Sequence, residues 1–365
     1  MAPYSSRPSL TRVDSEPGYR PRFIESKKVD HGQIQDLLSH SSKANQWTNF
    51  GPLSYMLEAE IAELLHLPDE LSVVACCNAT VALHALADMH RVLHGRPLRW
   101  VTSSFGFYSS CDGVLQDAAI VDCDQFGMLD IELLNVDEFD GLIVTNIFGQ
   151  QSDMDRYKQF AEQHQKILLI DSAMGFQVGG HLANSCISLH HTKPWGFGEG
   201  GCAIVSRENA PLFREMLSFG HPHPGAPINR LAVNGKISEV ACAYLLMRLD
   251  QAAQIREGYQ REFRRISSIG QKVGLAFLGS DPVHPGTPGS VPFLYPGPVN
   301  IEAEPLIPSR KYYFPLADTP TATGIYHRIV NVACHSEMDY FSDSQIEDYL
   351  SGLMDLIVGG KQEVI

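Results

Sequence analysis

Short apolar runs alternate with amphipathic segments along the chain from about residue 71. Apolar runs of this length predict strands, and the segments between them are long enough for helices. The runs predicted as strands are 73–76, 100–102, 119–121, 142–145 and 167–170, and the intervening amphipathic segments are 79–93, 107–115 and 154–164. Strands that alternate with helices are typical of right-handed βαβ units, so we expect a mostly parallel sheet.

The pattern changes in the second half of the chain. Two strand-like runs follow each other there without a helix between them, and a long stretch of helical periodicity comes later. The strands predicted in this half are 186–189, 202–205 and 329–333, with one more inside the Pro- and Gly-rich stretch 280–300, and the helices are 210–219, 237–269 and 343–357. We therefore expect a large α/β lobe followed by a smaller C-terminal α+β lobe.

Composition agrees with this division. The chain has 365 residues, 44% hydrophobic and 19% charged, which suits a globular protein of about two lobes and excludes a disordered chain or a coiled coil. The boundaries expected are a flexible N-terminal extension at 1–23, a large domain at 24–235 and a small domain at 236–365.

Charge and cysteine usage restrict the partners and the compartment. The net charge of −14 disfavours binding to nucleic acid and to anionic membranes. No apolar run approaches the ~18 residues that cross a bilayer, and the first 23 residues lack the apolar stretch of a signal peptide. The eight cysteines form no CxxC pair and lie mostly in apolar runs, which indicates reduced thiols in a cytoplasmic protein.

Three short segments together suggest a chemistry. Lys193 follows a short strand and precedes a glycine-rich turn, and Asp171 ends an apolar strand at the edge where parallel sheets bind ligands. The segment 77–80 joins a strand to a helix, whose N-terminus suits a phosphate. A lysine for a Schiff base, an aspartate for the pyridine nitrogen and a phosphate cradle are what pyridoxal 5′-phosphate (PLP) requires. Each segment alone is a weak signal, but in this order they predict a PLP site.

With these residues in place, the chain resembles the DegT-type sugar aminotransferases, which are fold-type I PLP enzymes. The resemblance runs from about Trp47 to the C-terminus. It implies a large, mostly parallel α/β/α sandwich lobe, L-glutamate as amino donor, a pyridoxamine phosphate intermediate form of the cofactor, and a homodimer with shared active sites. The segments that carry it are 47–52, 78–84, 103–107, 147–155, 171–173, 188–201 and 234–239.

The resemblance also implies roles for individual residues. Lys193 would form the Schiff base and then move a proton between cofactor and substrate carbons, and Asp171 would pair with the pyridinium. Phe107 would cover one face of the cofactor ring. The residues implied to hold the phosphate are Ala79, Thr80, Ser188 and, from the partner subunit, Asn234.

The substrate that accepts the amino group is harder to identify from the sequence than the cofactor. Residues 234–236 and 310–316 are most similar to the branch that makes dTDP-4-amino-4,6-dideoxyglucose, which implies a nucleotide-linked 4-keto-6-deoxyhexose as substrate. Met174 stands where the family usually has Gln or His and cannot form the same hydrogen bond, and the loop 222–229 is short. The residues expected to bind substrate are Thr48, Phe50, Met174, His191, Trp195, Lys236, Arg310 and Tyr312.

Other interpretations stay open. Trp195 either lines the cavity or packs in the core, His191 either lines the pocket or supports the backbone, and Arg310 is either a phosphate ligand or an ion-pair partner. A PLP- or pyridoxamine-phosphate-dependent sugar dehydratase is the alternative enzyme, although Lys193 argues against it, because such relatives commonly carry histidine there. A non-catalytic homologue that retains PLP, a 3-keto acceptor and an acceptor without a nucleotide are further alternatives. We expect no metal site.

Overall fold

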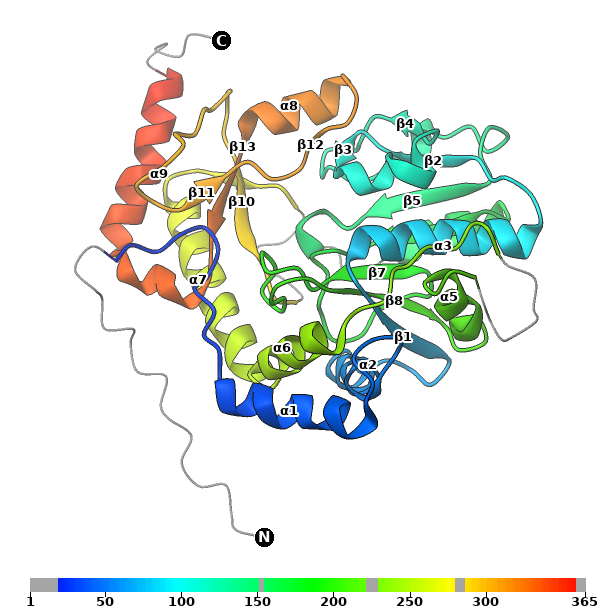
Figure 1. Cartoon of the computed structure of the whole chain (residues 1–365). Coiled ribbons are helices and arrows are strands. Elements are labelled where there is room, and N and C mark those ends of the chain that lie inside the picture. Colours follow the sequence, from blue (N-terminus) through cyan, green and yellow to red (C-terminus); the bar gives the residue numbers. More distant parts are fainter. Residues whose placement is uncertain (1–18, 151–153, 221–228, 280–285, 359–365) are drawn as a thin grey trace.

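The large lobe is built on a seven-stranded sheet with helices on both faces (Figure 1). The computed structural model describes residues 19–150, 154–220, 229–279 and 286–358. The strand order is β1-β8-β7-β6-β5-β2-β4, and β4, β2, β5, β6 and β7 run parallel, whereas β8 is antiparallel to both its neighbours. The strands are β1 Leu71–Cys76, β2 Trp100–Ser103, β4 Ala119–Val121, β5 Gly141–Thr145, β6 Ile167–Asp171, β7 Ser185–Ser188 and β8 Gly201–Ser206. The prediction of a mostly parallel α/β sheet is confirmed.

Alternation along the strands distributes side chains to two cores. In β6, Leu169 packs with helices α3 (Ala79–His94) and α5 (Ala210–Met216), while the next residue, Ile170, packs with α4 (Asp155–Gln163) on the opposite face. Helices α1 (His31–Ala44), α2 (Pro52–Leu64) and α6 (Glu239–Leu249) cover the β1 and β8 end of that second face. Because both faces are covered, most residues of these strands are apolar and buried, as in most parallel sheets.

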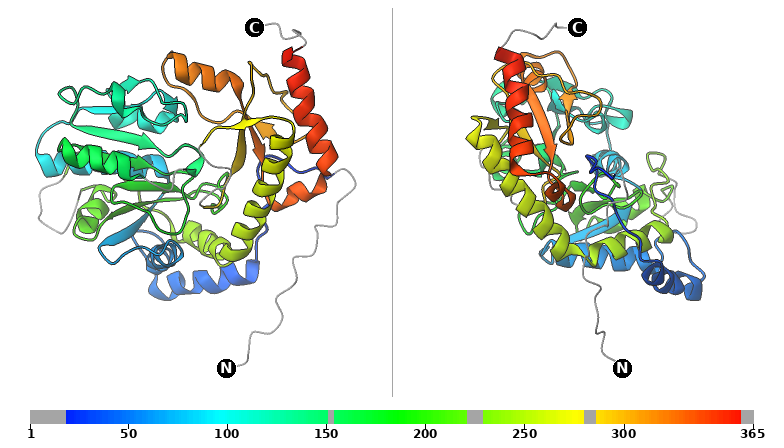
Figure 2. Two further views of the ribbon diagram at one scale, coloured as in Figure 1. Left: turned by 180° about the vertical axis from the view of Figure 1, so that it is seen from behind. Right: turned by 90° about the vertical axis from the view of Figure 1, so that its left-hand side faces the viewer.

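The small lobe holds an antiparallel sheet of order β11-β13-β10-β9, against which α7 and α9 pack (Figure 2). A two-stranded sheet of β12 and β3 connects the lobes. The elements of the small lobe are α7 Ala252–Lys272, β9 Ala276–Phe277, β10 Ser290–Leu294, β11 Ser309–Arg310, β12 Phe314–Pro315, α8 Pro320–Arg328, β13 Ile329–Ala333, η5 Ser336–Tyr340 and α9 Asp343–Val358. The large lobe also contains β3 Phe105–Gly106 and the short helical turns η1 Tyr108–Ser110, η2 Gly113–Leu115, η3 Ile131–Leu133 and η4 Ile147–Gly149. In the described part of the chain, no helix combines the length and apolarity needed to cross a membrane.

Two predicted segments differ in detail. The continuous helical periodicity of 237–269 belongs to two helices, α6 and α7, which are separated at Asp250 and Gln251. The separation lets α6 pack on α1 and α2 while α7 runs on to the small lobe. The segment 107–115 forms the short turns η1 and η2 and no α-helix, and Gly113, the first residue of η2, adopts a positive φ of 55° that interrupts a continuous helix.

An extended segment at residues 19–30 crosses from the small lobe to the large one. Arg20 donates to the carbonyl of Pro305 at 2.6 Å, His335 bonds the carbonyl of Arg22 at 2.8 Å, and the Phe23 ring stacks on Tyr312 with centroids 5.5 Å apart. Residues 1–23 are expected from the sequence to form a flexible extension. Residues 1–18 lie outside the described residues, and these contacts hold residues 19–23 against the small lobe.

A buried carboxylate joins α6 to α1 and α2. Glu239 has no exposed surface and accepts hydrogen bonds from the Ser41 hydroxyl at 2.9 Å and from the backbone N–H groups of Leu53 at 2.7 Å and Ser54 at 3.0 Å. It therefore acts as the N-terminal cap that α2 lacks locally. A Cβ at Gly51 would lie 2.6 Å from the carboxyl carbon, so glycine is required at that position.

Candidate active site

A cavity of about 390 Å³ lies where the carboxyl ends of β6 and β7, the N-terminus of α3 and the small lobe meet. This is the edge of a parallel sheet at which ligands bind. It is lined by six of the seven residues expected to bind the cofactor, namely Ala79, Thr80, Phe107, Asp171, Ser188 and Lys193. Met174 and Tyr312, from the expected substrate set, also line it.

Asp171 is held rigidly at the end of β6. It is 4% exposed, and its carboxylate accepts hydrogen bonds from the Ser109 hydroxyl at 3.1 Å and from the Ala173 N–H at 3.0 Å. Burial raises the pKa of Asp171, although these donors and the charge of Lys193 act in the opposite direction. Such a desolvated carboxylate is well suited to a cationic ring nitrogen, which would restore a favourable charge pair.

Lys193 lies in the turn between β7 and β8. Its N–H donates to the carbonyl of His190 at 2.8 Å, and its own carbonyl accepts from Gly196 at 3.1 Å. Burial lowers the pKa of Lys193 to about 8, and the attraction of Asp171 offsets only part of that shift. A lysine shifted in this direction has a larger neutral fraction near neutral pH, which is the form that acts as nucleophile or base.

The opposite end of the cavity suits a phosphate. Asn78 caps α3 by accepting from the Val81 N–H at 2.9 Å, and the N–H groups of Ala79 and Thr80 belong to the first turn, where no intrahelical partner exists. Ser188, 8% exposed at the end of β7, lines the same cavity. The start of β8 packs closely against the N-terminus of α3, since a Cβ at Gly201 would lie 2.5 Å from the Ala79 nitrogen.

Several lining residues were not foreseen. Phe148 and Tyr313 both adopt a φ of 55°, and their rings meet edge to face with centroids 5.0 Å apart. Non-glycine residues in this region carry strain, and such strain is concentrated at functional sites. Burial raises the pKa of Tyr313, whose phenol accepts a hydrogen bond from the Phe148 backbone. Phe23 also lines the cavity, from the segment assigned to an extension, and no local sequence pattern marks it.

Met174 occupies its place because two glycines make room. A Cβ at Gly289 would lie 2.3 Å from the Met174 methyl carbon, and a Cβ at Gly149 would lie 2.3 Å from its carbonyl oxygen. The thioether therefore lies against the small-lobe backbone at Gly289 and adds an apolar surface to the cavity.

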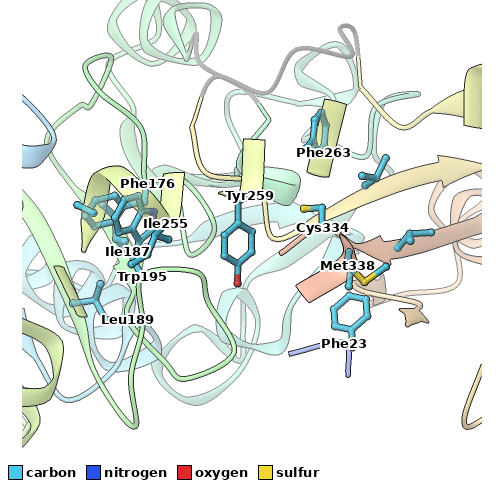
Figure 3. Packing of buried hydrophobic residues seen from close by; sticks show 14 of the residues in the cluster. Phe23, Phe176, Ile187, Leu189, Trp195, Ile255, Tyr259, Phe263, Cys334 and Met338 are labelled. Carbon is cyan, nitrogen blue, oxygen red and sulfur yellow. The ribbon is translucent and has the colours of Figure 1, made fainter. Parts of the chain in front are cut away.

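The other predicted residues lie outside this cavity. Thr48 is exposed, the Arg214 guanidinium lies 5.0 Å from the Phe50 ring, and Trp195 is 2% exposed and stacks on Phe176 in the core (Figure 3). The Lys236 ammonium donates to Asn234 at 2.6 Å on the surface. His191 packs edge to face on Phe197, and Arg310 lies over Phe23 at 5.3 Å. Most of the short loop 222–229, and residues 151–153 of the segment 147–155, lie outside the described residues.

The residues present fit PLP. A buried carboxylate, a lysine of lowered pKa and a helix N-terminus line one cavity, which is large enough for the cofactor and part of a substrate. Phe107, 46% exposed, lines the cavity from the segment after β3, where an aromatic ring can cover a bound pyridine.

Comparison with known proteins agrees with this site. The model of the DegT/DnrJ/EryC1/StrS aminotransferase family matches residues 29–283. Protein Rv3402c of Mycobacterium tuberculosis is 27% identical over 267 residues, which are 66% of this chain and only 62% of that protein's length. The dTDP-4-amino-4,6-dideoxy-D-glucose transaminase of Shigella dysenteriae is 25% identical over 260 residues, 62% of this chain and 68% of that enzyme.

Solved structures share the fold. DesI, determined with its TDP-sugar product, superposes with a TM-score of 0.71 at 20% identity over 92% of both chains. 3-Amino-5-hydroxybenzoic acid synthase gives a TM-score of 0.75 at 16% identity, covering 91% of this chain and 98% of that one. The fold-type I architecture is thereby confirmed. Because the family match covers more than half of the sequence, the chain belongs to the DegT/DnrJ/EryC1/StrS aminotransferase family of PLP-dependent enzymes.

Proposed function

We propose that the protein is an aminotransferase that moves an amino group from L-glutamate to a keto sugar, a nucleotide-linked (dTDP-type) 4-keto-6-deoxyhexose, in amino-sugar biosynthesis. The observation that carries the proposal is the meeting of Lys193, Asp171 and the N-terminus of α3 in one cavity. Catalytic function depends on a site more than on a fold, and this site has each group that amino transfer on PLP requires.

Bound PLP supplies an electron sink for the carbon that gains or loses a proton. Asp171 would keep the ring nitrogen charged, and Ser109 and the Ala173 N–H hold its carboxylate in place. Lys193 would hold the cofactor at its aldehyde carbon and, as a neutral amine, would carry the proton between a substrate carbon and a carbon of the cofactor. Its lowered pKa makes that neutral form accessible near pH 8.

Other residues anchor the two ends of the cofactor. Ala79 and Thr80 would donate from the first turn of α3 to the phosphate, and Ser188 would add a hydroxyl. Phe107 would stack on the pyridine ring, and stacking of this kind contributes about 1 kcal/mol. Together these residues would hold both ends of the cofactor.

Two observations support the acceptor. Arg310 lies over Phe23, which lines the cavity, so its guanidinium is near the rim, where a sugar-linked diphosphate would emerge. The Shigella relative is named for a dTDP-linked 4-amino sugar. We also place the enzyme in the cytoplasm, in agreement with its eight free cysteines.

Absorbance of the purified protein tests the function. Addition of L-glutamate is expected to convert the absorbance of bound PLP to that of pyridoxamine phosphate, and a dTDP-linked 4-keto-6-deoxyhexose is expected to restore it. A matched series of UDP-linked, 3-keto and nucleotide-free keto sugars then ranks the acceptors. A PLP band that glutamate leaves unchanged would contradict the donor, and recovery only with a nucleotide-free sugar would contradict the acceptor.

We further propose a homodimer with shared active sites. Asn234 is exposed, and the neighbouring Lys236 ammonium lies 4.4 Å from the centroid of Phe219, a ring that is 53% exposed. These three side chains form a surface patch outside their own cavity, and a two-fold partner would bury the patch and bring Asn234 to the partner's phosphate site.

Complementation tests the shared site. Lys193→Ala and Asn234→Ala are each expected to have little activity as pure proteins. In a mixed dimer, one cavity receives both wild-type residues, so random pairing should restore about a quarter of wild-type activity. Size-exclusion chromatography with light scattering measures the dimer. Full activity of Asn234→Ala, or no recovery on mixing, would rule out sharing through this residue.

A further inference from the structure

The turn that carries Lys193 is held from behind by a second lysine. The ammonium of Lys27 donates to three backbone carbonyls of this turn: His191 at 2.6 Å, Lys193 at 2.6 Å and Gly196 at 2.5 Å. Lys27 belongs to the extended segment 19–30, outside the region in which the sequence suggested any chemistry. Its three N–H donors are all used on the one turn.

A second cation completes the arrangement. Arg248 of α6, 6% exposed, donates through Nε at 3.0 Å and Nη2 at 2.7 Å to the carbonyl of Pro194, the residue that follows Lys193 in the turn. Arg248 also pairs with Glu25, which accepts from the Tyr259 hydroxyl at 3.1 Å. The carbonyls of His191, Lys193, Pro194 and Gly196 are therefore bound by two cations of fixed position.

These bonds determine the direction of the Lys193 side chain. Its N–H is bonded to His190, and its carbonyl is bonded to both Gly196 and Lys27, so the peptide planes on each side of its Cα are fixed. Fixed peptide planes set the Cα–Cβ bond, and with it the point from which the amine reaches into the cavity. The turn itself is tight, because a Cβ at Gly196 would lie 1.9 Å from the His190 carbonyl oxygen.

A positive charge on Lys27 is costly in free energy, because the ammonium is largely buried. Burial, and then repulsion from Arg248, lowers the pKa of Lys27 to about 7, while Glu25 acts in the opposite direction. A group that is costly to bury and does not line the cavity calls for a reason. The reason is that the Lys27 ammonium binds three backbone carbonyls of the Lys193 turn.

We propose that Lys27 is a positioning residue for Lys193, which acts by fixing the backbone of the turn so that the Lys193 amine meets the aldehyde carbon of PLP. This inference rests on the proposed role of Lys193. It assigns Lys27 no contact with cofactor or substrate, because its ammonium is used entirely on backbone carbonyls.

The comparison of two cofactor forms tests it without measuring activity. PLP bonds covalently to Lys193, whereas pyridoxamine phosphate uses the phosphate and ring contacts alone. In Lys27→Met, the dissociation constant of PLP for the apoprotein is expected to rise at least about tenfold, since misplacement of about 1 Å can cost a hundredfold. The dissociation constant of pyridoxamine phosphate should change less than about threefold. Both are measured by titration of tryptophan fluorescence.

Two further variants make the result decisive. Lys28→Met is the matched control, because Lys28 is the adjacent, exposed lysine, and it should leave both constants unchanged. Lys27→Gln retains two N–H donors, so it should lose less PLP affinity than Lys27→Met, and it carries the test if the methionine variant does not fold. Equal weakening of both cofactor forms would show a general structural role, and two unchanged dissociation constants would show no role at all; either result overturns the proposal.

Lys193→Ala separates this inference from the proposed function. It should abolish the preference for PLP over pyridoxamine phosphate. If it keeps the wild-type preference, the role of Lys193 itself fails, whatever Lys27 does. If Lys193→Ala loses the preference and the folded Lys27 variants keep it, only the positioning role fails.

Discussion

Replacement of Lys193 by alanine is expected to lower the transamination rate at least about a thousandfold. The variant loses both the nucleophile and the proton carrier, and acid–base catalysis by one positioned group alone contributes about a hundred- to ten-thousandfold. The measurement is the single-turnover rate with L-glutamate, with pyridoxamine phosphate formation as readout. Residual activity within about tenfold of wild type would exclude Lys193 as the catalytic base.

The control for this loss of activity is the stability of a variant that lacks the Lys193 amine. The folded-state pKa of Lys193, about 8, lies below its ordinary value of 10.5, so the folded chain holds this proton more weakly than the unfolded chain does. Stability of the apoprotein should therefore rise with pH between these two values. Lys193→Met removes the buried amine, so its apoprotein should melt at or above the wild-type temperature at pH 7. A clearly lower melting temperature would show that the amine stabilises the fold.

Replacement of Asp171 by asparagine is expected to reduce the same rate about a hundred- to a thousandfold, the usual effect of removing one preorganised electrostatic group. The amide has nearly the shape of the carboxylate and can still accept one hydrogen bond, but it carries no charge to keep the ring nitrogen protonated. The absorbance of bound PLP and the single-turnover rate report the change together.

Ser109→Ala is the matched control for Asp171. It removes one donor to the carboxylate, at 3.1 Å, and leaves both the charge and the Ala173 N–H in place. Its effect should be about tenfold, the lower end of the range for one hydrogen bond to a charged group, because the Ala173 N–H still holds the carboxylate. If Ser109→Ala and Asp171→Asn are equally slow, the orientation of the carboxylate and not its charge is the main requirement.

Much of the large lobe could be predicted because each of its strands is a compact apolar run. The limits of β2, β4, β5 and β6 agree with prediction to within one residue. Helices α1 and α2 were not foreseen: α1 begins at a local cap, Asp30, that was overlooked, whereas α2 receives its cap from Glu239, far along the chain. The break between α6 and α7 was missed for a similar reason, since it separates two sets of tertiary partners and leaves the helical periodicity intact.

The candidate site shows the same difference between residues that a local sequence pattern marks and residues that only tertiary packing brings to the site. Asp171 and Lys193 could be found because each lies next to a strand end in a recognisable local pattern. Phe23 could not, because tertiary packing alone brings this N-terminal residue to the cavity, and Tyr313 was missed although its neighbour Tyr312 was expected there. Met174 was identified as unusual, but its neighbour Gly289, which makes room for it, belongs to the small lobe.

The extended segment 19–30 also has a consequence for synthesis on the ribosome. Its hydrogen-bonding partners in the Lys193 turn, α6 and the small lobe follow it by 164 to 313 residues. The segment is translated well before its docking sites, and contacts of such long range are slow to form. Nascent chains should therefore complete the large sheet before the segment contacts the small lobe, and the cofactor pocket should be finished only after the small lobe has been translated.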